Sequence, residues 1–251
     1  MTHPFLDFPG PVGFAHRGGA MEAEENTAEA FAYAVGLGFR HIETDVHLSR
    51  DGVVVVHHDD DFKRMFGEPR RVADMDWSEI AGLRTAKGAA VPRLDAVLEA
   101  FPETCFNIEL KAHAVAGPLA EVIGRTGALD RVCVGAFDPK NTAAIRGILG
   151  DGLCWSPAHA GVARLWSAGW GVPVGRLPYQ VVQVPVAFRG IPVVTRRVVR
   201  AAHKRGVKVQ VWTVDDRAEM ERLLDLGVDG IMSDRPSVLR DVLRARGAWH
   251  S

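Results

Sequence analysis

Three carboxylates stand in short β-branched runs of the sequence, at spacings that would place them on one face of a strand. Glu43 and Asp45 are two residues apart, and Glu109 stands two residues before Lys111. Residues i and i+2 of a β-strand point to the same face. Three carboxylates without a thiolate form a hard oxygen site, which suits Mg²⁺ or Ca²⁺ better than Zn²⁺. Without a cation these groups would repel one another, and at least one would take up a proton.

Two histidines and two cations could complete this centre. His16 ends the run 12–16, and His58 follows a run of four valines and a histidine. Because imidazole titrates near neutral pH, one histidine can donate a proton while the other accepts one. Arg17 can bind a phosphate through two parallel hydrogen bonds, and Lys111 adds a second positive charge. Such a centre suits an anionic phosphoryl group whose leaving alkoxide needs a proton.

Each of these residues also has a purely structural interpretation. A lone carboxylate at a strand end is usually exposed or salt-bridged, and Glu109 with Lys111 could form an ion pair inside the protein. His58 could be the polar end of a strand, and 59–61 a solvated turn in which one aspartate supports a histidine. Their shared position at strand ends favours the functional interpretation. The other histidines in these and later runs are expected at the surface or around the site: His41, His47, His113, His159 and His203.

Strand-like runs alternate with helical patterns along the chain, which predicts eight βα units. The strands are expected near 12–16, 41–48 with 53–57, 105–111, 132–137, 153–156, 181–184, 208–214 and 230–233. The helices are expected near 27–37, 94–100, 116–126, 141–149, 162–168, 195–204, 217–226 and 237–246. This alternation is typical of a parallel sheet with helical crossovers. Eight units in 251 residues favour an α/β TIM (β/α)₈ barrel over an open sheet, with its active site at the C-terminal strand ends.

One segment, 59–91, interrupts this rhythm and is expected to form a short excursion over the barrel mouth after the second strand. It is too small for a second domain, and the chain contains no linker or low-complexity tract, so 1–251 is predicted to be a single domain. The composition, 47% hydrophobic and 24% charged, is that of a globular protein. A net charge of -1 gives no broad basic field, so we expect no nucleic-acid partner.

The cysteines and the terminus bear on the cellular compartment. Cys105, Cys133 and Cys154 are odd in number and lack C-x-x-C spacing, so we expect buried thiols. The first residues lack a basic region followed by an apolar stretch, and no run approaches the ~18 apolar residues of a membrane span. We therefore expect no signal peptide, no stable membrane anchor and a cytoplasmic location. The sequence does not indicate the oligomeric state.

Taken together, these residues resemble the glycerophosphodiester phosphodiesterase family over nearly the whole chain. The ordered motifs are AHRGG at 15–19, EENT at 24–27, ETDV at 43–46, RDGVVVVHHD at 50–59, NIELK at 107–111, VWTVD at 211–215 and GVDGIMSDRP at 227–236. The resemblance implies an enzyme that hydrolyses glycerophosphodiesters to glycerol 3-phosphate and an alcohol with one divalent cation, Mg²⁺ or Ca²⁺. The matching positions are His16 and His58 as the acid–base pair, Glu43, Asp45 and Glu109 as metal ligands, and Arg17, Lys111 and Trp212 as substrate contacts.

Further expectations follow from the same resemblance. Glu25 and Asn26 should order the first loop, with Asn26 also acting as a helix cap. Gln183 should face the pocket, and Trp212, matched to a wall of the alcohol pocket, could instead be an ordinary core aromatic. Asp215 departs from the asparagine that many relatives carry there. The excursion is also shorter than the substrate-capping insertion of some relatives, which leaves the substrate's alcohol group open.

Two other functions are open at this point. Phospholipase-D-like hydrolysis of lysophospholipids would use the same centre, and Trp166, Trp170 and Phe188 could line an apolar entrance. Related sphingomyelinase-D-like enzymes usually offer aspartate as the third ligand, so Glu109 argues against them. The second alternative is a non-catalytic barrel that binds a phosphorylated metabolite or a partner protein, since barrels host many functions. The presence of every acid, base and ligand type argues against it.

Overall fold

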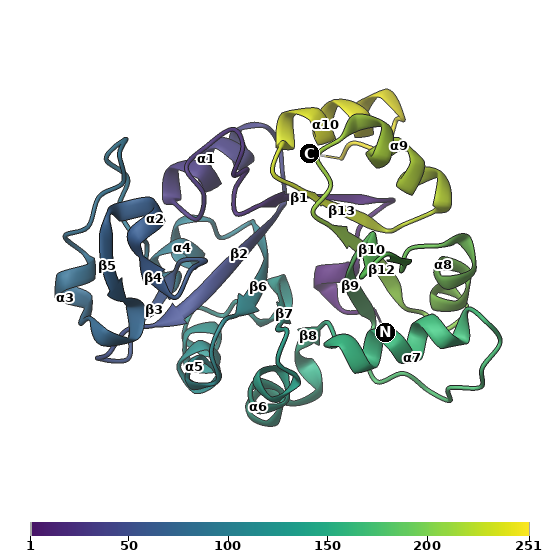
Figure 1. The fold of residues 1–251 in the computed structure, drawn as a ribbon, viewed down its shortest axis with the longest axis horizontal. Coiled ribbons are helices and arrows are strands. Elements are labelled where there is room, and N and C mark those ends of the chain that lie inside the picture. Colours follow the sequence, from purple (N-terminus) through teal and green to yellow (C-terminus); the bar gives the residue numbers. More distant parts are fainter. Residues whose placement is uncertain (1, 251) are drawn as a thin grey trace.

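Eight parallel strands form a nearly closed ring in the computed structural model, which describes residues 2–250 (Figure 1). The strands pair in the order β8-β7-β6-β2-β1-β13-β12-β9. The (β/α)₈ barrel expected from the sequence is therefore confirmed. The barrel strands are β1 (Val12–His16), β2 (His41–Leu48), β6 (Cys105–Leu110), β7 (Val132–Gly135), β8 (Cys154–Trp155), β9 (Val181–Pro185), β12 (Lys208–Trp212) and β13 (Gly230–Ser233).

A side chain joins β8 and β9 where the strand ladder is missing. β8 has only two residues, and within the described chain it pairs with β7 alone. The backbone N–H of Gln183 on β9 instead donates to Ser156 Oγ, just after β8, at 2.9 Å. Inside the barrel, the Gln183 amide donates to Asn107 Oδ1 at 2.8 Å and to Gln210 Oε1 at 3.0 Å. Gln183 thus links β9 to β6 and β12 across the interior.

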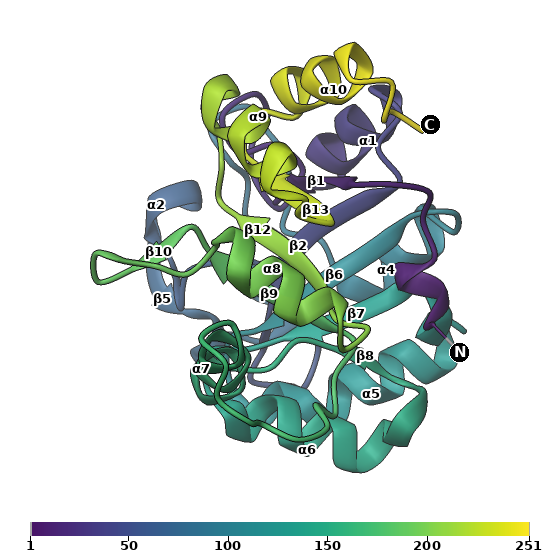
Figure 2. The same ribbon diagram turned by 90° about the vertical axis from the view of Figure 1, so that its right-hand side faces the viewer.

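Helices surround the ring on its outer side (Figures 1 and 2). Four of them begin at a residue whose side chain accepts a hydrogen bond from the first turn, namely Thr27, Asp138, Thr195 and Asp216. Their apolar faces cover buried strand residues such as Ile42, Phe106 and Ile108. None of the helices in 2–250 combines the length and apolar composition needed to cross a bilayer. The helices are α1 (Ala28–Gly36), α4 (Leu94–Ala100), α5 (Ala116–Arg125), α6 (Pro139–Leu149), α7 (His159–Ala168), α8 (Arg196–His203), α9 (Arg217–Leu226) and α10 (Pro236–Ala245).

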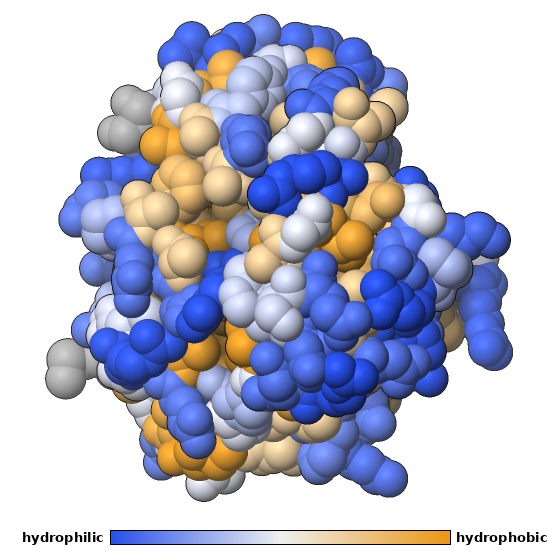
Figure 3. Space-filling model, turned by 90° about the vertical axis from the view of Figure 1, so that its left-hand side faces the viewer, coloured by the Kyte–Doolittle hydropathy of each residue, from blue (hydrophilic) through white to orange (hydrophobic). Residues whose placement is uncertain are grey.

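The excursion packs beside the barrel around β3 (Val54–Val56), which runs antiparallel to β2 (left of Figure 1). Its apolar side chains form a cluster of their own that includes Phe62, Met75 and Ile80. The face at the left of Figure 1 is largely hydrophilic, with apolar side chains gathered in separate patches (Figure 3). The excursion contains β4 (Asp61–Phe62), α2 (Lys63–Phe66), β5 (Glu68–Arg71) and α3 (Trp77–Ile80).

Short elements complete the chain. A hairpin of β10 (Ala187–Phe188) and β11 (Ile191–Pro192) follows β9 and projects from the barrel (Figure 2). Of the three free cysteines, Cys133 and Cys154 are buried as expected, and Cys105 is half-buried. The 3₁₀ turns are η1 (Pro4–Leu6), η2 (Val72–Asp74), η3 (His113–Val115), η4 (Leu129–Arg131) and η5 (Gly150–Gly152).

His41, at the first position of β2, lies in the core and not at the surface or around the site as expected. Its ring makes edge-on contacts with Phe5, Phe8 and Phe14, and only 3% of the residue is exposed. Nε2 lies 3.3 Å from the Phe5 carbonyl oxygen. Burial lowers the pKa of His41 to about 4, because the charged imidazolium cannot be hydrated there.

This depressed pKa predicts an acid-sensitive fold. The unfolded chain binds the His41 proton near pH 6.5 and the folded chain only near pH 4, so stability is lost as pH falls between these values. At about 1.4 kcal/mol per pKa unit, we expect roughly 2–3 kcal/mol to be lost by pH 4.5. Urea unfolding at pH 7 and pH 4.5 checks this, and His41→Leu should lose that much less than wild type. Equal losses in both proteins would contradict the assignment.

Candidate active site

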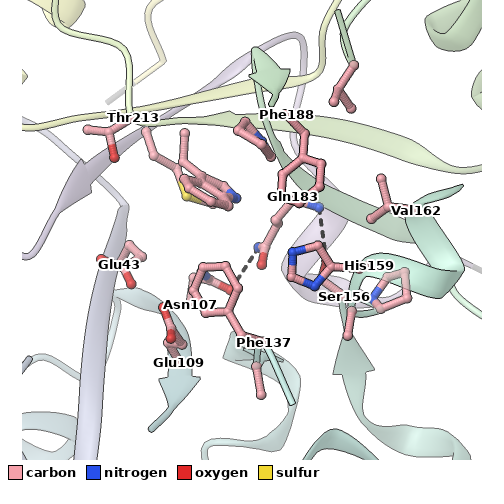
Figure 4. Close-up of a pocket in the computed structure, with 18 of the residues that line it drawn as sticks. Glu43, Asn107, Glu109, Phe137, Ser156, His159, Val162, Gln183, Phe188 and Thr213 are labelled. Atoms are coloured by element: carbon pink, nitrogen blue, oxygen red, sulfur yellow. Dashed lines mark hydrogen bonds between the residues drawn. The ribbon is translucent and has the colours of Figure 1, made fainter. Parts of the chain in front are cut away.

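The three carboxylates from β2 and β6 lie together at the C-terminal end of the barrel. Asp45 and Glu109 are register partners on adjacent strands, and Glu43 precedes them on the same face of β2. One oxygen from each carboxylate lies within 4.8 Å of the others. Glu43 and Asp45 are buried, and Glu109 is partly exposed. Figure 4 shows Glu43 and Glu109 on one side of a cavity.

Two cations only partly balance this cluster. Lys111 Nζ lies 2.8 Å from Asp45 Oδ1 and 2.9 Å from Glu109 Oε1, and Arg17 Nε lies 3.3 Å from Asp45 Oδ2. Although burial opposes it, these cations lower the pKa of Asp45. Burial and then Asp45 raise the pKa of Glu43 to about 8. A buried carboxyl that can ionise only at a cost, within an all-oxygen set, fits a hard divalent cation such as Mg²⁺ or Ca²⁺.

The loop after β1 makes contacts so close that its glycines cannot carry side chains. A Cβ on Gly18 would lie 2.7 Å from the Ala30 side chain, and one on Gly19 would lie 2.7 Å from Pro236 Cγ. Both glycines have positive φ, and Arg17 between them and β1 also has φ 52°. This left-handed turn places the Arg17 guanidinium beside the carboxylates, which explains the AHRGG pattern.

Asn26 orients one of the carboxylates. Its Nδ2 donates to Asp45 Oδ2 at 2.9 Å, and its Oδ1 accepts from Thr44 Oγ1 at 2.7 Å. The expected helix cap is a different residue, because Thr27 and not Asn26 accepts the N–H of Ala30. Asn26 has φ 56°, a conformation that asparagine tolerates better than most residues and that lies outside the helix.

Each of the two histidines is held by an aspartate through Nδ1. His16 Nδ1 lies 2.6 Å from Asp234 Oδ1, and His58 Nδ1 lies 2.7 Å from Asp59 Oδ1. An aspartate at Nδ1 fixes the tautomer and leaves Nε2 to exchange protons with a substrate. His16 Nε2 lies 3.5 Å from Glu43 Oε2. Burial alone would lower the pKa of His16, but Glu43 and Asp234 outweigh it and raise that pKa.

The two aspartates are fixed in turn by neighbouring loops. Asp215 Oδ1 accepts the backbone N–H of Asp234 at 2.7 Å. Arg64 of the excursion donates to Asp59 at 2.7 Å and to Glu25 at 2.6 Å. One aspartate of 59–61 was expected to support a histidine, and Asp59 does so, whereas no such role was expected of Asp234. The signal for Asp234 was its position directly after a strand, in line with His16 on the adjacent β1.

A cavity of about 580 Å³ opens beside these groups (Figure 4). Its polar end contains both histidines, Arg17, Lys111 and two of the carboxylates, and Gln183 lines it as expected. Its opposite wall is apolar and comes from the loop after β7, from α7, from the β10–β11 hairpin and from β12. Phe137 and His159 also line the cavity. The sequence pattern assigned neither a role in the pocket, since Phe137 is the last residue of the expected strand 132–137 and His159 is expected only at the surface or around the site. The apolar wall includes Phe137, Val162, Trp166, Phe188, Ile191 and Trp212.

The fold and the cavity together define a class of protein, a TIM-barrel enzyme with an acidic cluster and two aspartate-held histidines at the strand ends. Comparison with known proteins makes the assignment specific. Residues 16–238 match the model of the glycerophosphoryl diester phosphodiesterase family. The chain belongs to this family.

Individual relatives match over nearly their whole length. The chain is 37% identical to "Probable glycerophosphodiester phosphodiesterase 2" of Mycobacterium tuberculosis, over 99% of this chain and 96% of that protein. It is 31% identical to the glycerophosphodiester phosphodiesterase of Caldanaerobacter subterraneus, over 93% and 98%. Its fold is similar to an Oleispira antarctica phosphodiesterase solved with the product sn-glycerol-3-phosphate (TM-score 0.79, 21% identity, 94% and 97% covered).

Proposed function

We propose that this protein hydrolyses glycerophosphodiesters to glycerol 3-phosphate and an alcohol. The observation that carries the proposal is that two aspartate-held histidines line one cavity beside a cluster of three carboxylates, two of which also line it. Membership of the family and the names of its relatives support the same reaction. The single-domain organisation and the cytoplasmic location expected from the sequence remain predictions.

The histidines would move the two protons that the hydrolysis requires. One takes a proton from the attacking hydroxyl or water through Nε2, and the other donates a proton to the leaving alkoxide. Asp234 and Asp59 stabilise the imidazolium that forms on either side. Arg17 and Lys111, already at the carboxylates, would turn their remaining N–H groups to the phosphate oxygens.

The divalent cation would be held by Glu43, Asp45 and Glu109, with Asn26 fixing the orientation of Asp45. When bound, it would supply positive charge to the phosphoryl oxygens as they become more negative. The partly exposed Glu109 leaves room for a substrate oxygen at this end of the cavity. Trp212 would form part of the wall against which the organic portion of the substrate packs.

Release of glycerol 3-phosphate from a soluble panel tests this function. The panel would contain glycerophosphocholine, glycerophosphoethanolamine and glycerophosphoglycerol, each assayed as purified, after chelation, and after addition of Mg²⁺ or Ca²⁺. We expect release that chelation removes and one of the two ions restores. No release from any diester with either ion would refute the proposal.

A second candidate function, lysophospholipase D activity, is favoured by one observation. The wall opposite the carboxylates is apolar and continues onto the exposed Phe188 and Ile191 of the β10–β11 hairpin. A single hydrocarbon chain attached to the glycerol could lie along this wall and bury apolar surface. Detergent-dispersed lysophospholipid, assayed beside the soluble panel, separates the two functions. Faster release from the lysolipid than from every soluble diester would favour the second candidate.

A further inference from the structure

The segment 152–214 differs in charge from the rest of the chain. It contains nine Lys and Arg residues and no Asp or Glu, although the whole chain has 30 of the former and 31 of the latter. Outside the barrel strands this segment forms α7, the β10–β11 hairpin and α8, which lie on one side of the barrel (Figure 2). The net charge of -1 therefore conceals a basic surface on this side.

Four exposed arginines of this segment have no charged partner of their own. Among residues 2–250, none of them donates a side-chain hydrogen bond or forms an ion pair. The Arg189 guanidinium lies over the Phe188 ring, 5.4 Å from its centre, and that of Arg197 lies over the Trp170 ring at 4.9 Å. A contact with a ring leaves the N–H groups unpaired, so they are available to an outside anion. The four are Arg189, Arg196, Arg197 and Arg200.

Large apolar side chains are exposed in the same segment. Phe188 and Ile191 are opposite residues of the hairpin and are 44% and 55% exposed. Opposite residues in a hairpin share a face, so these two side chains lie together. Trp170 and Val172 follow α7 directly, and each is 49% exposed. Apolar side chains gathered at a surface in this way mark an interaction site.

Two contacts join these side chains into one surface. The Trp166 indole donates to the Pro192 carbonyl oxygen at 3.1 Å, which ties α7 to the end of the hairpin. The rings of Trp166 and Trp170 lie 5.4 Å apart. The tip of the hairpin is a two-residue turn, Arg189 and Gly190, with positive φ at both positions, so the hairpin is a short and defined projection. The hairpin surface, as we call it, consists of Trp170, Val172, Phe188, Ile191 and the four arginines.

We infer that the hairpin surface docks reversibly on a lipid bilayer that contains anionic phospholipid. The arginines would meet the lipid phosphates, and the apolar side chains would enter the boundary between headgroups and acyl chains. Tryptophan favours that boundary, because its ring is largely apolar and its N–H is polar. Phe188 and Ile191 also line the cavity, so docking would hold the mouth of the cavity at the bilayer.

A bilayer fits this surface better than an acidic protein does. A protein interface needs a partner of complementary shape, whereas here the apolar side chains stand on a projecting hairpin and on a separate turn after α7. A bilayer adapts to such a shape and offers negative charge and apolar depth together. The inference concerns where the protein docks and not which diester it hydrolyses, so it goes beyond the proposed function and can fail separately from it.

Sedimentation with vesicles tests the inference. One kind of vesicle contains phosphatidylcholine alone, and the other contains equal amounts of phosphatidylcholine and phosphatidylglycerol. We expect wild type to sediment with the anionic vesicles, less so at high salt, and not with the neutral ones. Arg189→Gln should weaken this binding about fivefold, the effect of one basic residue near such a surface. Trp170→Ser should also weaken it about fivefold, because less apolar area then leaves water.

Arg244→Gln and Ile148→Ser are the matched controls. Arg244 is an exposed arginine over an aromatic ring, as Arg189 is, but it lies on α10, and Ile148 is 59% exposed on α6. Both control variants should bind vesicles as wild type does. Neither Arg189 nor Trp170 lines the cavity, so their variants should hydrolyse soluble diesters at the wild-type rate. Arg189, at the tip of a turn, keeps the test decisive if the Trp170 variant does not fold.

Several results would overturn the inference. Wild type that stays in solution with both kinds of vesicle, or that binds both equally, would do so. Binding by the Arg189 and Trp170 variants that equals binding by the controls would place any docking elsewhere. Saturable binding of polyglutamate without binding to vesicles would overturn it in favour of an acidic protein partner. Each of these results leaves the release of glycerol 3-phosphate from the soluble panel as a separate test of the proposed function.

Discussion

His16→Ala and His58→Ala are each expected to lower kcat by about 10²–10⁴-fold, the contribution of one general acid or base. The two losses should not multiply in the double variant, because both groups serve one proton-transfer sequence. Each ring is fixed at Nδ1 by an aspartate, so its removal takes away a preset proton carrier and not a flexible surface group. Single-turnover release of glycerol 3-phosphate at saturating cation measures the effect.

The matched control for these variants is His113→Ala. His113 is an exposed imidazole in η3, close in sequence to Glu109 and Lys111 but absent from the lining of the cavity. It should retain wild-type activity. Asp234→Asn should lose less than His16→Ala, because the ring remains and only its preferred tautomer is lost. Full activity in His16→Ala or His58→Ala would remove that residue from the mechanism.

The barrel was predictable because its signals are local and repeated. Each strand is a short β-branched run, and most helices begin or end at a residue with a recognisable cap, as Thr27, Asp138 and Gly227 do. The way the barrel closes between β8 and β9 was not predictable. No strand ladder joins them within residues 2–250, and the Gln183 backbone N–H donates instead to the Ser156 side chain, 27 residues earlier in the chain. The strand and helix propensities of the residues do not predict such a contact.

The polar half of the site was predictable for the same reason, because residues at i and i+2 near the end of a strand point to the same face of the sheet. His41 shows the limit of that reasoning, since the same residue type at the start of a strand lies among aromatic rings at the other end of the barrel. Phe137 ends the expected strand 132–137, but β7 stops at Gly135, so the loop that follows sets the direction in which Phe137 lines the cavity.

Glu43→Gln is expected to abolish cation binding and at the same time to stabilise the cation-free protein. Glu43 is buried beside Asp45, and its raised pKa means that the cation-free folded chain holds a proton the unfolded chain releases. That folded chain therefore loses stability as pH rises from about 4.5 to about 8. Glutamine keeps the shape and removes this cost, so cation-free Glu43→Gln should unfold at a higher temperature than cation-free wild type at pH 8.

Calorimetry with Mg²⁺ and Ca²⁺ completes the argument, because its readout does not depend on turnover. A cation at 100 times its Kd stabilises the folded state by about 2.7 kcal/mol, which is roughly 5–10 °C for a chain of this size. Wild type and the control Glu121→Gln, an exposed carboxylate on α5, should both gain this increment, and Glu43→Gln should not. An equal gain in all three proteins would place the cation elsewhere. A gain with Mg²⁺ alone would indicate that the three carboxylates accept near-octahedral geometry, whereas a gain with Ca²⁺ alone would indicate a looser set of ligands.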